Sequence, residues 1–196
     1  MNLKVGLIFF LVSFYFTSCD KIKWYHTIFN EHQIGDKIDS LNGVYVYYND
    51  KVTNVSGRNL TPDGYNLGLK YQCVEFVKRY YYEHYNHKMP DSYGHAKDFF
   101  IEGLSDGAFV KRRNLYQYSN PGKTKPKEGD LLVYGPTAFN AYGHVAIVSK
   151  VKRNKIEIIQ QNPGAYVPSR EIYGLKNSGG KWAIDHGNIK GWLRKK

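Results

Sequence analysis

Three side chains in this sequence have the types and the order needed for nucleophilic chemistry on a carbonyl group. Cys73 lies in YQCVEFVKRYYYEHY, where a helical pattern begins. His144 lies in YGHVAIVSKV, an alternating segment typical of a strand, and Gln160 closes the next alternating segment, KIEIIQQN. A thiol at a helix start, an imidazole on a strand and an amide on the neighbouring strand form an arrangement that supports acyl transfer.

Cys73 is expected to be a nucleophile with a lowered thiol pKa. The reference pKa of a cysteine is about 8.5, and a helix N-terminus with a nearby imidazolium lowers it by several units. Gln72 stands immediately before it and belongs to the same expected helix start. The competing interpretation is an unreactive cysteine that is buried on the inner face of the helix.

His144 is the candidate base. It alternates with Ala146 and Val148, so a buried core histidine is the competing interpretation. Gly143 before it leaves access to the ring, and the loop PTAFNAYG would form the rim of a cleft. The other histidines are weaker candidates, and His186, in the turn IDHGN, is the reserve.

The third member of the site would accept a hydrogen bond from the imidazole and orient it. Gln160 and Asn162 share one face of the strand that ends in IIQQN, and Gln161 takes the other face. An amide can hold the ring, although it stabilises an imidazolium less than a carboxylate does. Gln160 is the favoured candidate. The competing interpretation is that it is a polar residue at a hairpin end without a role in the site.

No spacing in the chain supports a metal or phosphate site. A zinc site needs three or four ligands, and the spacings CxxC, HxxxH and HExxH do not occur. A glycine-rich phosphate loop does not occur either. We therefore expect neither a metal ion nor a cofactor, and chemistry that the side chains carry alone.

Residues 1–18 are expected to be an export signal. One early charge, Lys4, precedes an apolar run that is shorter than a membrane-spanning helix requires. The segment Phe16-Thr17-Ser18-Cys19 is similar to a lipobox, which predicts cleavage before Cys19 and a lipid on its thiol. An ordinary secretory peptide with an incidental cysteine is the alternative. The lipobox predicts a membrane-anchored lipoprotein of the bacterial cell envelope, with residues 19–41 as a tether and no disulfide within the chain.

The composition predicts a single basic domain. The chain has 196 residues, 42% of them hydrophobic, and a net charge of +11. Removing residues 1–18 takes away one positive charge and leaves about +10, from 27 basic and 17 acidic residues. The basic residues are scattered apart from short patches at 111–113 and 193–196, so nucleic acid is not an expected partner. Anionic lipid or cell-wall polymer suits an exported basic protein better.

The elements expected around these residues are a helix followed by a run of strands. A strand over 43–48 leads into a long polar loop, and the helix covers 69 to about 85. A second, short helix is expected over 94–103, and Arg153-Asn154 predicts a hairpin turn. The fold class is therefore α+β, with the helix packed across an antiparallel sheet. The later strands are expected at 108–112, 130–134, 144–152, 155–161, 169–173, 182–186 and 189–193.

These segments resemble the CHAP family of cysteine amidases and peptidases, which are relatives of the NlpC/P60 and papain-like enzymes. The similarity covers about 42–192, within a domain expected over 42–196. Inside the family, the chain looks most like the amidase domain of bifunctional glutathionylspermidine synthetase/amidase. The similarity rests on YQCVEFVKR (71–79), PKEGDLLVY (126–134), GHVAIVSKV (143–151), KIEIIQQN (155–162) and a closing Gly-Trp (191–192).

The resemblance implies a papain-like fold whose N-terminal helix carries the nucleophile. It implies Cys73 as nucleophile, His144 as general base and then acid, and Gln160 at the third position. Gln72 and Asn162 would support the site, and the backbone N–H of the cysteine would contribute to an oxyanion hole. The glutathionylspermidine amidases carry Glu at the third position, and this chain departs from them there.

Three functions are consistent with these residues. The first is an exported cysteine amidase or endopeptidase that cleaves peptidoglycan peptides through a Cys-His-(Gln/Asn) site and an acyl-enzyme. The second is an amidase for glutathionylspermidine-like or γ-glutamyl conjugates. The third is a non-catalytic lipoprotein that binds the wall or a partner, for which Gln160 is the support. The expected partners are a peptidoglycan peptide or a small amide conjugate, and a membrane through the lipid on Cys19.

Overall fold

The computed structural model describes residues 32–91, 93–164 and 167–196. The expected export signal, the lipidation candidate Cys19 and the first part of the expected tether lie outside these residues. The chain divides into two units, Met1–His32 and Gln33–Lys196, and the helices and strands described here belong to the second. No helix among the described residues is long and apolar enough to cross a membrane.

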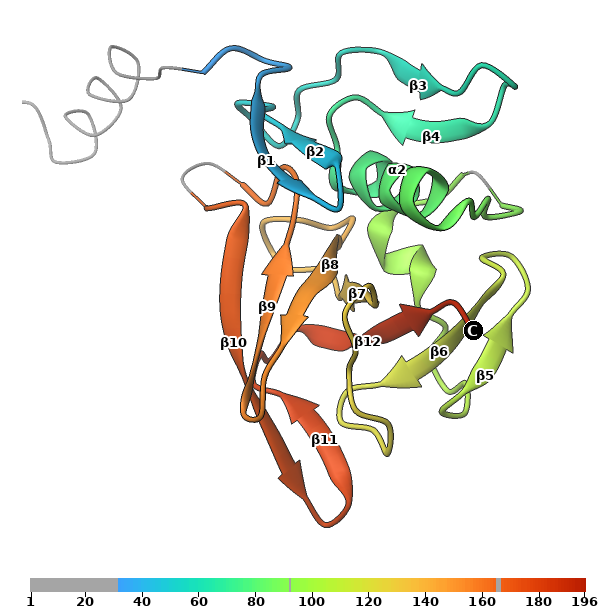
Figure 1. The fold of residues 1–196 in the computed structure, drawn as a ribbon, viewed down its shortest axis with the longest axis vertical. Helices are drawn as coiled ribbons and strands as arrows, with labels where there is room; N and C mark the ends of the chain where they lie inside the picture. The colour runs from blue at the N-terminus through green and yellow to red at the C-terminus, as the bar shows by residue number, and fades with distance from the viewer. Residues whose placement is uncertain (1–31, 92, 165–166) are drawn as a thin grey trace, which may run out of the picture. The chain divides into compact units, whose positions relative to one another are not determined.

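The second unit combines α2, a short 3₁₀ helix η1 and strands β1 to β12 (Figure 1). This is an α+β fold, as the sequence predicted, with α2 packed against β8 of the main sheet. In chain order the elements are β1 (Lys37–Leu41), β2 (Val44–Tyr47), β3 (Arg58–Leu60), β4 (Asn66–Leu69), α2 (Cys73–Tyr85), η1 (Ala96–Phe99), β5 (Ala108–Val110), β6 (Leu115–Ser119), β7 (Leu131–Tyr134), β8 (His144–Val151), β9 (Lys155–Ile159), β10 (Arg170–Ser178), β11 (Lys181–Ile184) and β12 (Ile189–Arg194).

Eight strands form one sheet in the order β11-β10-β9-β8-β7-β12-β6-β5. The predicted hairpin joins β8 to β9, with Ile147 opposite Ile159, and β10 pairs with the other side of β9, with Arg170 opposite Ile159. All three strands are antiparallel to their neighbours. The start of β8, the end of β9 and the start of β10 therefore lie at one end of the sheet, and this is the end that carries His144.

Alternation along β8 gives the sheet two apolar faces. Val145 and Ile147 belong to a buried core that they share with Phe76 of α2. Ala146 and Val148 belong to a second core on the opposite face of the sheet. Because side chains alternate along a strand, burial on both faces holds β8 rigidly in place.

The helix begins at Cys73 rather than at residue 69 because strand pairing continues up to Leu69. β3 and β4 form a two-stranded sheet inside the segment that was predicted to be a loop. Gly68 in β4 has a φ of 135°, and a Cβ atom there would lie 3.1 Å from Cα of Glu75. Only glycine allows the strand to pass so close to the first turn of the helix. The thiol is thereby placed at the N-terminal residue of α2.

Two further strands differ from the sequence prediction. Residues 37–41, which were expected to be part of the tether, form β1 and pair with β2. β6 was not predicted, although it pairs with both β5 and β12. Its central residue, Gln117, is fully buried and bonds the backbone N–H and carbonyl of Ile101, both at 2.8 Å. A buried amide in the middle of the strand hid the apolar alternation that would have indicated it.

Candidate active site

Cys73 is the first residue of α2, at the point where the helix meets the main sheet. The preceding residue, Gln72, is extended, with φ −86° and ψ 161°, and its side chain does not cap the helix. The thiol is half-buried and lies at the backbone N–H of Val145, the residue that follows His144. The packing of α2 on β8 therefore carries the predicted nucleophile to the strand that bears the predicted base.

Burial sets the ionisation of this thiol. It raises the pKa of Cys73 to about 11, although the backbone N–H groups of Val145 and Val74 favour the thiolate. The expectation of a lowered thiol pKa is wrong for this structure, because desolvation outweighs the helix N-terminus. Cys73 is therefore a neutral thiol at pH 7, and a base must take its proton during attack.

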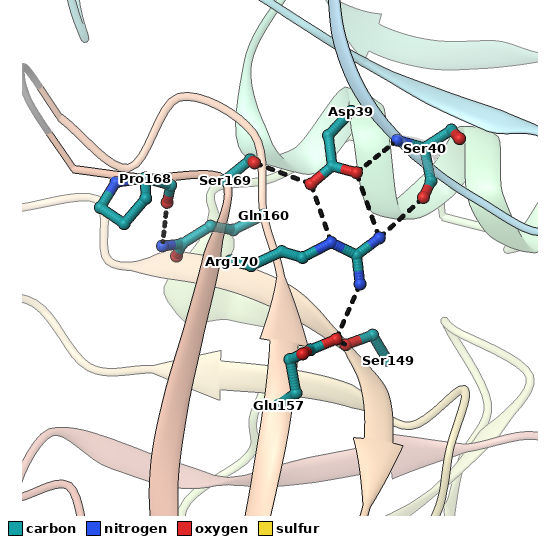
Figure 2. Close-up of polar contacts among 8 residues, drawn as sticks. All are labelled: Asp39, Ser40, Ser149, Glu157, Gln160, Pro168, Ser169 and Arg170. Atoms are coloured by element: carbon teal, nitrogen blue, oxygen red, sulfur yellow. Dashed lines mark hydrogen bonds and ion pairs between the residues drawn. The ribbon is translucent and has the colours of Figure 1, made fainter.

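The ring of His144 is held by Gln160. Nε2 of the ring lies 3.0 Å from Oε1 of Gln160. The amide nitrogen of Gln160 donates to the carbonyl oxygen of Pro168 at 3.1 Å (Figure 2) and to Oε1 of Glu171 at 2.7 Å. Since the amide nitrogen already has two acceptors, the amide oxygen faces the ring, and His144 donates to it from Nε2. Nδ1 then carries the lone pair, and it has no hydrogen-bond partner within the described part of the chain.

His144 is neutral at pH 7. Burial lowers the pKa of its ring to about 4, whereas the hydrogen bond to Gln160 and the charge of Glu171 act in the opposite direction. A neutral imidazole with a free Nδ1 lone pair can accept the proton of a neutral thiol during its attack. The arrangement can thus support acyl transfer without a preformed thiolate–imidazolium pair.

The sequence predictions missed Glu171 and Pro168. The pairing of β10 with β9 sets Glu171 opposite Ile158, so these two side chains share one face of the sheet. Gln160 lies two residues after Ile158 and therefore points to the same face as Glu171. The strand that contains Glu171 could be predicted from the sequence. Its register against β9 could not, and the register brings the carboxylate to the amide.

Gln161 connects the end of β9 to the start of α2, from the face opposite to the amide that holds the ring. Its Nε2 donates to Oε2 of Glu75 at 2.8 Å and to the carbonyl oxygen of Gln72 at 3.1 Å. Glu75 is fully buried and forms an ion pair with Arg79, with Nε 2.6 Å from Oε1. This buried network fixes the end of the helix that carries Cys73.

Asn162 was predicted to share a face with Gln160, but it lies beside Gln72. Its Nδ2 donates to Oε1 of Gln72 at 2.9 Å, and the Gln72 amide in turn donates to the carbonyl of Asn54 at 2.7 Å. Asn162 has a φ of 54°, so the strand alternation has ended before it. The two predicted supporting residues bond to each other, and among the described contacts neither bonds to His144.

His186, the reserve candidate for the base, belongs to a cluster of aromatic rings. Its ring centroid lies 5.3 Å from that of Tyr134 and 4.9 Å from that of Tyr173. The Tyr134 ring lies 5.5 Å from the ring of His144. His186 therefore contacts Tyr134 and Tyr173, and Tyr134 in turn contacts His144. His144 remains the candidate base.

The loop 135–143 leads directly into His144 and carries exposed aromatic side chains. Phe139 is fully exposed and Tyr142 is 60% exposed. Gly143 has a φ of 74°, and a Cβ atom there would lie 2.7 Å from the carbonyl oxygen of Tyr134. Glycine is thus needed immediately before His144, because a side chain would push the loop away from β7.

We expect Cys73 in the folded chain to react with iodoacetamide more slowly at neutral pH than the same residue does in urea. The midpoint of its rate against pH should lie above that of the unfolded thiol, because burial raises the pKa to about 11. Mass spectrometry of the Cys73 peptide follows the rate without interference from Cys19, and in the folded chain the rate should still be rising at about pH 10. A rate that reaches its plateau below about pH 8 in the folded chain would instead show a preformed ion pair.

The chain is similar in sequence to known proteins. A family model described as the CHAP domain matches residues 63–162, about half of the chain. Trypanothione synthetase from Crithidia fasciculata is 29% identical over 107 residues, which make up 55% of this chain and 16% of that protein. Bifunctional glutathionylspermidine synthetase/amidase from Escherichia coli (strain K12) is 28% identical over 146 residues, covering 69% of this chain and 23% of that protein. The chain thus spans less than a quarter of the length of these two relatives.

Among solved structures, the wild-type endolysin LysIME-EF1 aligns over 71% of this chain and 58% of that chain. The TM-score of this alignment is 0.37, and the sequence identity is 21%.

Proposed function

This chain belongs to the CHAP domain family, whose members are amidases and peptidases, and on that premise we propose that it hydrolyses amide bonds through Cys73, His144 and Gln160. The contact that carries the proposal is the one between Nε2 of His144 and Oε1 of Gln160, at 3.0 Å. It turns the Nδ1 lone pair away from Gln160 and leaves it free to serve the thiol.

In the first half of the proposed reaction, Nδ1 of His144 takes the proton from the Cys73 thiol while the sulfur attacks the carbonyl carbon of the amide. The carbonyl oxygen becomes an oxyanion, to which the backbone N–H of Cys73 can donate. The imidazolium, whose Nε2–H is held by Gln160, then gives its proton to the leaving nitrogen. The C–N bond breaks, the amine departs, and a thioester remains on Cys73.

In the second half, water replaces the amine. Nδ1 of His144, which is neutral again, takes a proton from the water as its oxygen attacks the thioester carbonyl. The C–S bond breaks, the proton returns to the sulfur, and a carboxylic acid leaves. The neutral states of both side chains at pH 7 suit this cycle, because the base starts each half without a proton.

We further propose that the amide lies in peptidoglycan peptides and that the protein is an exported lipoprotein anchored through Cys19. The support is the apolar segment with its lipobox-like end, together with a net charge of about +10 after cleavage, from 27 basic and 17 acidic residues, which suits an anionic cell wall. A membrane-anchored hydrolase outside the cytoplasm meets stem and cross-bridge peptides, which contain many amide bonds.

A small amide conjugate is the second candidate substrate. Its support is the relative from Escherichia coli (strain K12), which is named as a glutathionylspermidine synthetase/amidase and matches 69% of this chain. A non-catalytic binding role is the third candidate. Its support is the amide of Gln160, because an amide stabilises an imidazolium less than a carboxylate does.

The three candidates are separated by incubating the purified full chain with peptidoglycan sacculi and, in parallel, with glutathionylspermidine. Peptidoglycan hydrolysis predicts new muropeptides in which one amide bond is lost, and their absence with the Cys73→Ala variant. Release of spermidine with unchanged sacculi would contradict the first candidate and support the second. Retention of the protein on sacculi without any new product would support the binding role.

A further inference from the structure

We propose that Glu171 is a positioning residue of this site, whose carboxylate acts through the Gln160 amide to fix the His144 tautomer and to place a negative charge behind the ring. The inference deepens the proposed function and rests on it for the role of His144. It explains how an amide can occupy the third position of the site. The negative charge that a carboxylate would supply there comes instead from Glu171, which contacts Gln160.

The Gln160 amide is held in one orientation. Its nitrogen lies 2.7 Å from Oε1 of Glu171 and 3.1 Å from the carbonyl oxygen of Pro168. Both of these groups only accept hydrogen bonds, so a flipped amide would set its oxygen against two other oxygens. Glu171 and Pro168 together therefore exclude the flipped amide.

This orientation of the amide fixes the tautomer of His144. With the amide nitrogen turned toward Glu171, the atom of Gln160 that lies 3.0 Å from Nε2 of the ring is an acceptor. Nε2 must then carry the proton, and Nδ1 must carry the lone pair. The opposite tautomer would leave the base without a lone pair at Nδ1.

Glu171 is itself held in place by its neighbours. Its second oxygen, Oε2, accepts the hydroxyl of Tyr173 at 3.0 Å, so both carboxylate oxygens have donors. Next to it, Arg170 is held between Asp39, with Nε 2.9 Å from Oδ2, and Glu157, with Nη1 2.8 Å from Oε1 (Figure 2). The start of β10 is thereby anchored to β1 and β9, which keeps Glu171 at the amide.

Glu171 also acts on the His144 ring through its charge. In the described part of the chain, three titratable groups neighbour His144: the Tyr134 ring of β7 lies 5.5 Å from its ring, Glu171 of β10 reaches it through Gln160, and the Cys73 thiol of α2 lies at the backbone N–H of the next residue, Val145. Among the described residues, Glu171 is the charged group that acts on the ring, and it raises the pKa of His144 against the effect of burial. A carboxylate at this position also stabilises the imidazolium that forms when the thiol proton is transferred.

The test is Glu171→Gln, which keeps the shape and removes the charge. A glutamine can present either a donor or an acceptor to Gln160, so the Gln160 amide can flip. We expect the ¹⁵N NMR signals of the His144 ring to change from the Nε2–H tautomer to a mixture, and the titration midpoint of the ring to move to lower pH. If the chain hydrolyses amides, kcat/KM should fall by about 10-fold to 100-fold, and the acid limb of its pH profile should also move to lower pH.

The matched control is Glu128→Gln, which removes the same charge near the other end of β8, where Glu128 accepts the backbone N–H of Val151 at 3.2 Å. It should change neither the tautomer nor the titration of His144. A second variant, Gln160→Glu with Glu171→Gln, moves the carboxylate into contact with the ring. It should restore Nε2–H as the single tautomer and raise the titration midpoint to the wild-type position or above it.

The NMR measurements do not require turnover, so they separate this inference from the proposed function. Unchanged tautomer and titration in Glu171→Gln would overturn the inference, even if activity fell. A changed tautomer and titration in a chain that cleaves no amide would support the positioning role and contradict the hydrolase proposal. A titration midpoint of His144 that stays low in the double variant would also overturn the inference. A carboxylate next to the His144 ring would then have no effect on its titration.

Discussion

Replacing His144 with alanine is expected to lower kcat/KM for amide hydrolysis by about 10³-fold or more while the fold is retained. The reason is the pKa of the Cys73 thiol, which burial raises to about 11. Without a base, only about one thiol in 10⁴ would be ionised at neutral pH. Initial rates at saturating and subsaturating substrate, with circular dichroism to confirm the fold, measure the effect.

The same experiment tests whether the two side chains act as one unit. Cys73→Ala should lose at least as much activity, and the double variant with His144→Ala should lose no more than the more damaging single change. His84→Ala is the control, because His84 is exposed on α2 and bonds Asn42 at 3.2 Å instead of the site. Losses that multiply in the double variant would show that His144 does not serve the thiol.

Replacing Arg79 with methionine is expected to lower the free energy of unfolding by about 3–5 kcal/mol. Glu75 is fully buried, and its Oε1 lies 2.6 Å from Nε of Arg79. Methionine fills a similar volume but, among the described residues, leaves the Glu75 carboxylate with the amides of Gln161 and Asn59 as its side-chain donors. A buried charge without its partner is costly, because the protein interior replaces its hydration poorly. Urea unfolding of the full chain measures the loss.

The control for Arg79→Met is Lys176→Met. Lys176 pairs with Asp185 at 2.7 Å, and both side chains are more than half exposed, so the free energy of unfolding should hardly change. Because the Glu75 network also bonds the carbonyl of Gln72, Arg79→Met should slow amide hydrolysis as well by loosening the start of α2. A free energy of unfolding equal to that of Lys176→Met would show that the buried pair contributes little.

The residues of the sequence determined which side chains could form the candidate site and much of the framework around it. The thiol in YQCVEFVKR, the imidazole at the start of GHVAIVSKV and the amide that ends KIEIIQQ could be assigned to a helix and two strands from local patterns alone. Periodicity, glycine positions and turn residues depend on neighbours in the chain, so they are visible in the sequence. The hairpin at residues 153–154 then brings His144 and Gln160 to one end of the sheet, where their side chains meet at 3.0 Å.

The tertiary structure decided the ionisation and the outer contacts of the site. A lowered pKa was expected for Cys73, but burial against the sheet raises it, and burial is not a local property of the sequence. The start of α2 depends on the close passage of Gly68 past Glu75, and the contact of Glu171 with Gln160 depends on the register of β10 against β9. Each of these arises between residues that are distant in sequence or on separate elements, and their positions are fixed only when the core packs.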